Sequence, residues 1–274
     1  MRFAALTAAW LLATVLALAF LALPVIAIFA HASPGHLIHQ LSNPVVKDAL
    51  VVSLKTSLIA QVLILFFGTP AAYLLASRRF PGRGLALLLV ELPLVLPPAV
   101  AGIGLLAAFG RFGLLGSSLR ALGVSLPFTQ SAVTVAVAFV ASPLYVRSAI
   151  AAFESTDPNL AAASRTLGAG PGRTFFRIVL PLARAGLAAG LALSFARGLG
   201  EFGATIMFAG SLQGVTQTLP LAIYYEFGRN FNAALAISGV LVFVSVVLLV
   251  TLRIGLSWQS SPSTGSRSLF GLST

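Results

Sequence analysis

Six long apolar segments divide this sequence, over residues 4–30, 53–76, 84–109, 131–152, 182–209 and 233–256. Each holds roughly 20 or more mostly apolar residues, about the length that an α-helix needs to cross a hydrocarbon core about 30 Å thick. Only 8% of the residues are charged and 58% are hydrophobic, so the charged surface that a soluble domain needs is missing. The sequence predicts an all-α, polytopic membrane helical bundle of about six transmembrane helices.

The first segment also has features of a cleavable signal peptide. Arg2 precedes the apolar run, and Ala30-His31-Ala32 imitates a small-residue cleavage site. The run is about 25 residues long, however, well beyond the roughly 7–15 residues of a signal-peptide core. We therefore expect a retained first helix, which forms residues 1–48 together with an extracytoplasmic loop. An even number of spans places both termini on the same side of the membrane.

Basic residues outnumber acidic ones by 17 to 6, for a formal charge of +11. In a soluble protein this excess would suggest nucleic acid, but in a membrane protein basic residues gather in cytoplasmic loops. With the N-terminus inside, eleven basic residues face the cytoplasm, namely Arg2, Arg78, Arg79, Arg83, Arg147, Arg165, Arg173, Arg177, Arg184, Arg253 and Arg267. Five lie on the opposite side, namely Lys47, Lys55, Arg111, Arg120 and Arg229. We expect a bacterial inner-membrane protein with both termini cytoplasmic and no nucleic-acid partner.

Metal and thiol chemistry find little support in the sequence. The absence of cysteine excludes disulfides, thiolate metal sites and cysteine nucleophiles. The three histidines, His31, His36 and His39, crowd into one loop, where a solvated loop is favoured over a metal site. We predict no metal site. Residues 257–274, rich in Ser, Gly and Thr, are predicted to form a disordered cytoplasmic tail after a transmembrane domain over residues 49–256.

The connection over residues 154–181 does not have the composition of a linker. Asp157 can cap a helix that has Pro158 in its first turn, and residues 159–167 are good helix formers. Gly168, Gly170 and Pro171 then end it. A short helix held between two spanning helices is suited to being bound by another protein. An interfacial helix that rests on lipid headgroups fits the residues equally well.

The same loop carries a motif at fixed spacing. Gly168, nine further residues, and then Ile178, Leu180 and Pro181 follow the second half of the pattern E-A-A-x3-G-x9-I-x-L-P, whose first half falls on Ala162, Ala163 and Ser164. This pattern resembles the EAA motif of importer permeases in the ABC transporter superfamily. In that family the loop is a coupling helix that docks into a groove of a cytoplasmic ATPase. Ala162 replaces the acidic residue of the motif, while Arg165 and the small residues stay available for docking.

The resemblance extends from about residue 49 to residue 253. The stretches "ALVVSLKTSLIA", "ELPLVLPPAVAGIGLL", "GEFGATIMFAG" and "TLPLAIY" are similar to the molybdate and tungstate branch, and the sulfate and thiosulfate branch is close. The resemblance implies a type I ABC importer permease fold and alternating-access transport of a tetrahedral oxyanion, molybdate or tungstate, with sulfate or thiosulfate as the alternative. It also implies two ATPase subunits, an extracytoplasmic molybdate-binding protein and a second, identical permease copy.

The sequence has no G-x-x-x-x-G-K-[ST] loop, so ATP and magnesium are expected on the partner ATPase and no cofactor on this chain. We therefore predict a non-catalytic permease subunit. An integral membrane enzyme would need acids or histidines that converge on a site, and here they are scattered. An ion-coupled secondary transporter would fit the composition but would leave the 154–181 loop unexplained.

The stretch "RGLGEFG" matches a dinucleotide fingerprint in Gly198, Gly200 and Gly203, but it lies inside an apolar span and not in a βαβ unit. These glycines are expected to allow close helix contact or local unwinding. Arg197 and Glu201 are four residues apart, so we expect them to share a helix face and neutralise each other. The pair is either an internal brace or part of the translocation pathway or its gate.

The third apolar segment contains an acidic residue and several prolines. Glu91 lies on the order of 10 Å into the span at 1.5 Å per residue. An unpaired carboxylate would repel an oxyanion, so Glu91 is expected to be paired or off the pathway. Pro97 and Pro98 break the helix, which serves either transport or packing alone.

Overall fold

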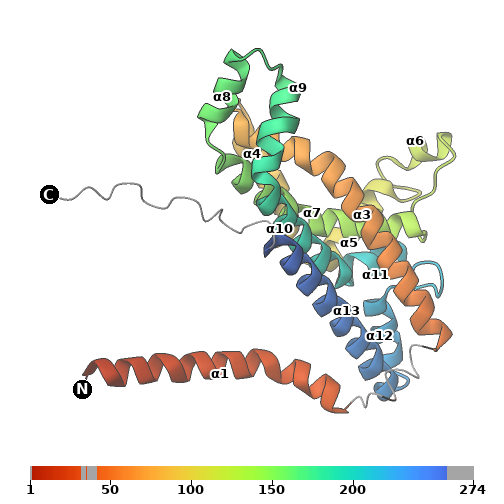
Figure 1. The fold of residues 1–274 in the computed structure, drawn as a ribbon. Helices are drawn as coiled ribbons and strands as arrows, with labels where there is room; N and C mark the ends of the chain where they lie inside the picture. The colour runs from red at the N-terminus through yellow and green to blue at the C-terminus, as the bar shows by residue number, and fades with distance from the viewer. Residues whose placement is uncertain (1, 32–34, 36–41, 258–274) are drawn as a thin grey trace.

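The computed structural model describes residues 2–31, 35 and 42–257, and these residues form helices without any strand. The predicted all-α class is confirmed (Figure 1). The helices are α1 (Arg2–His31), α3 (Pro44–Ser77), α4 (Arg83–Val95), α5 (Pro98–Phe109), α6 (Gly116–Ala121), α7 (Gln130–Glu154), α8 (Pro158–Thr166), α9 (Pro171–Thr174), the π-helical turn η1 (Phe175–Val179), α10 (Leu180–Leu199), α11 (Gly203–Ala209), α12 (Leu219–Phe227) and α13 (Phe231–Ser257). The predicted tail and two of the three histidines, His36 and His39, lie outside the described residues.

Five helical stretches are long and apolar enough to cross a membrane, and a bent pair of helices makes a sixth candidate span within the described residues. The prediction of about six spans is therefore confirmed. The break predicted at Pro97 and Pro98 within residues 84–109 is present, because α4 ends at Val95, α5 begins at Pro98 and the two helices meet at an angle of 118°. Pro98 supplies no backbone N–H and restricts the residue before it, and Pro97 accordingly has an extended conformation.

The segment predicted over residues 182–209 is also not one helix. The span begins earlier, at Pro171, and ends at Leu199. Residues 200–202 are not helical, and α11 then starts at Gly203. Gly200 supports this break, since glycine costs a helix roughly 1 kcal/mol relative to alanine.

The centre of the bundle is α7, which packs against α3 and α10. One apolar cluster joins these three helices around the fully buried side chain of Tyr145. A second cluster joins α5, α7 and α11 and includes the buried Phe208. The core is therefore built on two sides of a single helix.

The first helix stands apart from this core. It contacts α13, and the side chains described over residues 6–31 are largely exposed (Figure 1). An exposed helix of 26 residues with a mean hydropathy of 2.8 must face lipid or another protein surface.

Candidate functional site

The 154–181 loop folds as a compact helical projection at one end of the bundle, opposite α12 (Figure 1). The carboxylate of Asp157 accepts a hydrogen bond of 2.9 Å from the backbone N–H of Asn159, and α8 follows directly. Gly168 ends this part of the loop with φ of +82°, a conformation that side-chain-bearing residues rarely adopt. The helix, its cap and its glycine stop are thus as predicted, to within one residue.

A buried hydrogen bond makes this loop rigid. The hydroxyl groups of Ser164 in α8 and Thr174 in α9 lie 2.8 Å apart, and both side chains are buried. Thr174 belongs to the helical run that continues through η1 into α10. The hydrogen bond therefore links α8 to the helical run that becomes a membrane-spanning helix. Thr174 was not predicted from the sequence, where one more threonine in a polar loop gives no distinctive signal.

The other motif residues divide between the surface and the core of the loop. Ala162, Ala163 and Arg165 are exposed, whereas Ile178 and Leu180 are half-buried. Ala162 and Arg165 line a cavity of about 400 Å³ between α8 and the ends of α3 and α7. This surface combines small side chains with the exposed guanidinium group of Arg165, a pattern suited to contact with another protein.

A π-helical turn precedes the last motif residue, Pro181. The backbone N–H of Leu180 donates to the carbonyl of Phe175, five residues earlier. Proline has no N–H to continue the α-helical pattern in the next turn. A π-turn of this kind frequently accompanies functional sites.

A second group of predicted residues forms the α10–α11 corner, residues 197–205. Arg197 Nη1 lies 2.8 Å from Glu201 Oε2, so the predicted pairing is correct. The two residues do not share one helix face, because α10 ends at Leu199 and Glu201 lies in the break. The other carboxylate oxygen, Oε1, accepts the backbone N–H of Ala204 at 2.8 Å. Glu201 therefore links the end of α10 to the first turn of α11.

The glycines of the corner lie at close contacts. A Cβ atom on Gly198 would lie 2.9 Å from Val137 Cγ1, and one on Gly203 would lie 2.6 Å from Pro98 Cβ. Gly200 has more room, with no such atom nearer than 3.9 Å, and lies in the break itself. The α10–α11 break thus packs directly on the start of α5, next to the break at Pro97. Two interruptions that are far apart in sequence meet in space.

Glu91 belongs to a different ion pair. Its Oε1 atom lies 3.5 Å from Arg147 Nε, which connects α4 to α7. Both side chains are roughly half exposed. Glu91 is therefore paired with a cation, which is one of the two arrangements that the sequence predicted for it.

Buried polar groups continue from the corner into the core. Gln61 Nε2 donates to Ser194 Oγ at 3.3 Å, and Ser194 Oγ donates to the carbonyl of Ala141 at 3.0 Å, which joins α3, α10 and α7. Gln61 Oε1 and the Thr205 hydroxyl are buried without a hydrogen-bond partner in the described residues. Gln61 was not predicted, although a glutamine inside an apolar span is the signal that would have identified it.

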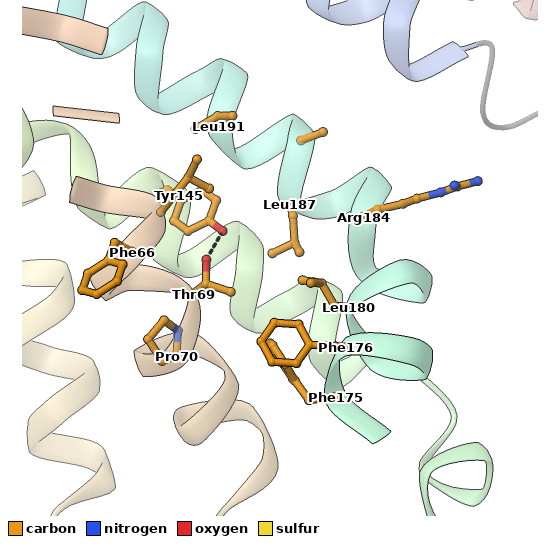
Figure 2. A pocket seen from close by; sticks show the side chains of 12 residues that line it. Phe66, Thr69, Pro70, Tyr145, Phe175, Phe176, Leu180, Arg184, Leu187 and Leu191 are labelled. Carbon is orange, nitrogen blue, oxygen red and sulfur yellow. Dashed lines mark hydrogen bonds between the residues drawn. The ribbon is translucent and has the colours of Figure 1, made fainter. Parts of the chain in front are cut away.

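The cavity shown in Figure 2 differs from both sites. It has a volume of about 620 Å³ and lies between α3, α7 and α10. Its walls are mainly aliphatic and aromatic, the side chain of Arg184 at one edge extends away from the other lining residues in Figure 2, and the Tyr145 hydroxyl is already hydrogen-bonded to Thr69 at 2.6 Å. Such a surface offers an oxyanion few donors. Among the described residues, no group of three or more His, Asp or Glu side chains is arranged to bind a metal.

Comparison with known proteins agrees with these features. The model of a family described as "Binding-protein-dependent transport system inner membrane component" matches residues 64–256. The chain is 44% identical over 238 residues to the molybdenum transport system permease protein ModB of Mycobacterium tuberculosis, which covers 86% of this chain and 89% of the relative. It is 35% identical over 235 residues to the sulfate transport system permease protein CysW of a Synechocystis species, which covers 84% and 85%.

A solved structure shares the fold. A chain of a bacterial ABC transporter involved in the import of the acidic polysaccharide alginate superposes with a TM-score of 0.67 at 19% identity, over 93% of this chain and 96% of that one. The predicted importer-permease fold is confirmed by this likeness. Since the family model matches more than half of the sequence, the chain belongs to the inner membrane components of binding-protein-dependent transport systems.

Proposed function

We propose that this chain is the transmembrane subunit of an ATP-driven importer of molybdate or tungstate. The observation that carries the proposal is its 44% identity, over 86% of its length, to a permease named for molybdenum transport. Sulfate is the second candidate substrate, favoured by the 35% identity to CysW. Both are tetrahedral dianions, so the same arrangement of donors would serve either.

The 154–181 loop is the docking element for a separate ATPase in this proposal. Support comes from the exposed Ala162, Ala163 and Arg165 on α8, and from the buried bond between Ser164 and Thr174 behind them. The chain itself is not catalytic, and ATP and magnesium belong to the ATPase. This assignment places the loop and both termini in the cytoplasm, in agreement with the excess of basic residues at that end.

The α10–α11 corner is proposed to line the translocation pathway. The side chain of Arg197 is about one-third exposed, although it lies in an apolar span. An arginine is too costly to face hydrocarbon, so its exposed part is expected to face water between two permease copies. Gly198, Gly200, Gly203, Pro97 and Pro98 provide the breaks that let this region change shape. Two copies of the chain and an extracytoplasmic binding protein complete the proposed importer.

Reconstitution tests the function. The chain, its cognate ATPase and its binding protein are placed in proteoliposomes, and uptake of molybdate and of sulfate is followed with and without ATP. We expect ATP-dependent molybdate uptake that tenfold more sulfate does not abolish. Sulfate uptake with no molybdate uptake would reverse the choice of substrate. Absence of any ATP-dependent oxyanion uptake would contradict the proposed function.

A further inference from the structure

The carboxylate of Glu201 connects two elements that would otherwise be joined only by a three-residue break. Its Oε2 atom pairs with Arg197 in the last turn of α10, and its Oε1 atom caps the backbone N–H of Ala204 in the first turn of α11. The carboxylate is buried, with a side-chain exposure of 1%. Without Arg197 beside it, a charged group in this position would be strongly disfavoured.

The contact with Glu201 does not occupy all the hydrogen-bond donors of Arg197. A guanidinium group has five N–H donors, and the ion pair with Glu201 occupies Nη1. The arginine is more exposed than its partner, at 34% against 1%. An anion can therefore approach the arginine from the side that is not covered by Glu201.

The first turn of α11 is packed tightly against α5. A Cβ atom on Gly102 of α5 would lie 2.6 Å from the carbonyl oxygen of Ala204, and the contact between Gly203 and Pro98 is equally close. Thr205, the next residue of α11, has a buried hydroxyl without a hydrogen-bond partner in the described residues. The position of α11 is thus fixed by shape on one side and by the Glu201 cap on the other.

We propose that Glu201 is an anion-displaced latch: an oxyanion that binds the uncovered side of Arg197 repels the Glu201 carboxylate, which moves away and releases the first turn of α11 from its cap. The proposal rests on the proposed function, because it needs an oxyanion in the pathway beside Arg197. It adds a positioning role for Glu201 and a reason why the substrate opens the corner.

The physical basis is competition between like charges. A dianion next to Arg197 repels the Glu201 carboxylate, which then keeps only the neutral Ala204 N–H as partner in a buried site. Such a state is unfavourable, so the carboxylate moves away and α11 loses its cap. Because Ala204 contacts α5 through Gly102, the change reaches the second break at Pro97. Binding and opening are therefore linked, and each must favour the other by the same factor.

Charge, rather than shape, is the property that this latch detects. A tetrahedral dianion such as molybdate or sulfate can outcompete one carboxylate for Arg197. Perchlorate has the same shape with a single charge and is a weaker competitor. We therefore expect the corner to open with molybdate and sulfate and to stay closed with perchlorate at equal concentration.

Spin labels measure the opening directly. The chain has no cysteine, so Ile103→Cys on α5 and Met207→Cys on α11, both exposed positions, introduce two labelling sites in each copy of the chain, which is labelled before it is combined with the ATPase. The labelled permease, assembled with its ATPase in nanodiscs, is titrated with molybdate and with perchlorate. A change in the distance between the labels with molybdate, and none with perchlorate, supports the latch. No change in the distance with molybdate, or an equal change with both anions, overturns the latch.

Neutral variants distinguish a latch from a brace, in which the Arg197–Glu201 pair only stabilises the structure. Glu201→Gln keeps an oxygen for the Ala204 N–H but no longer competes for Arg197, so half-maximal stimulation of the ATPase should need at least about tenfold less molybdate. Arg197→Gln should remove the stimulation. The double variant Arg197→Gln/Glu201→Gln restores a neutral hydrogen-bonded pair, which would rescue a brace but leaves a latch without its anion site.

The outcomes distinguish this proposal from the proposed function. If the wild-type importer takes up no oxyanion, the function itself fails. If wild-type uptake is normal, while Glu201→Gln leaves the molybdate dependence unchanged and the double variant is rescued, only the latch fails. Tyr145→Phe, which removes a hydroxyl hydrogen-bonded to Thr69 elsewhere in the core, serves as the matched control and should leave the molybdate dependence unchanged.

Discussion

The hydroxyl groups of Ser164 and Thr174 lie 2.8 Å apart in a buried contact that fastens the short helix α8 to the helical run leading into the membrane. This contact turns the loop into a lever that transmits a pull on α8 to α10.

Replacing Thr174 by valine tests this lever. The substitution keeps the shape but removes the hydroxyl, so Ser164 loses its partner across the loop at a cost of about 1 kcal/mol. We expect assembly with the ATPase to persist while the molybdate transported per ATP hydrolysed falls. Thr166→Val is the control, because Thr166 bonds only to a carbonyl of its own helix, that of Ala163. Equal transport yields in the two variants would exclude the lever.

Substitutions at Gly168 distinguish the effect of backbone strain from the effect of a bulky side chain on the docking surface. Its φ of +82° penalises any residue with a Cβ atom by about 1–2 kcal/mol, although no neighbouring atom lies within 4 Å of the added carbon. Gly168→Asn should be tolerated best, because asparagine accepts left-handed geometry. Gly168→Arg should insert into the membrane normally and yet lose ATPase docking, measured by co-purification. Normal transport by the arginine variant would contradict a docking role for this loop.

Two glycines of α5 form a matched pair for the contact with α11. A Cβ atom on Gly102 would lie 2.6 Å from the Ala204 carbonyl oxygen, whereas Gly104 has open space around it. Gly102→Ala should destabilise the protein by about 1–3 kcal/mol through overpacking, and Gly104→Ala should be neutral. Thermal unfolding in detergent compares the two. Identical midpoints would show that α5 and α11 are not in close contact.

The bond between Tyr145 and Thr69 predicts a stability effect without a transport effect. The ring of Tyr145 is fully buried, and its hydroxyl lies 2.6 Å from Thr69 Oγ1 beside the apolar cavity. Tyr145→Phe keeps the ring and removes the bond, so we expect a loss of about 0.5–1.5 kcal/mol in unfolding free energy. Oxyanion uptake should match that of the wild type. A large fall in uptake at unchanged protein level would place this bond in the transport cycle.

Local patterns predicted much of the candidate site. The cap at Asp157, the stop at Gly168 and the pairing of Arg197 with Glu201 each depend on residues at most four apart, or on one residue's own backbone conformation. Such features follow from chain geometry alone. The same reasoning located the break at Pro97 and Pro98 and allowed for unwinding at the glycines near residue 200. It could not give the 118° angle between α4 and α5 or the start of the fifth span at Pro171, because both depend on contacts with other helices.

The sequence by itself determined that the chain is an all-α membrane protein and that a short helix begins after Asp157 and ends before Gly168 in the 154–181 loop. Hydrophobic length and capping chemistry are local and leave few alternatives. Only the tertiary structure decided that Gly203 lies against Pro98, that Gln61 reaches Ser194 across 133 residues, and that Glu201 caps α11 while it holds Arg197. Those contacts depend on how helices cross and pack, which is set by the shapes of many side chains together rather than by any short stretch of sequence.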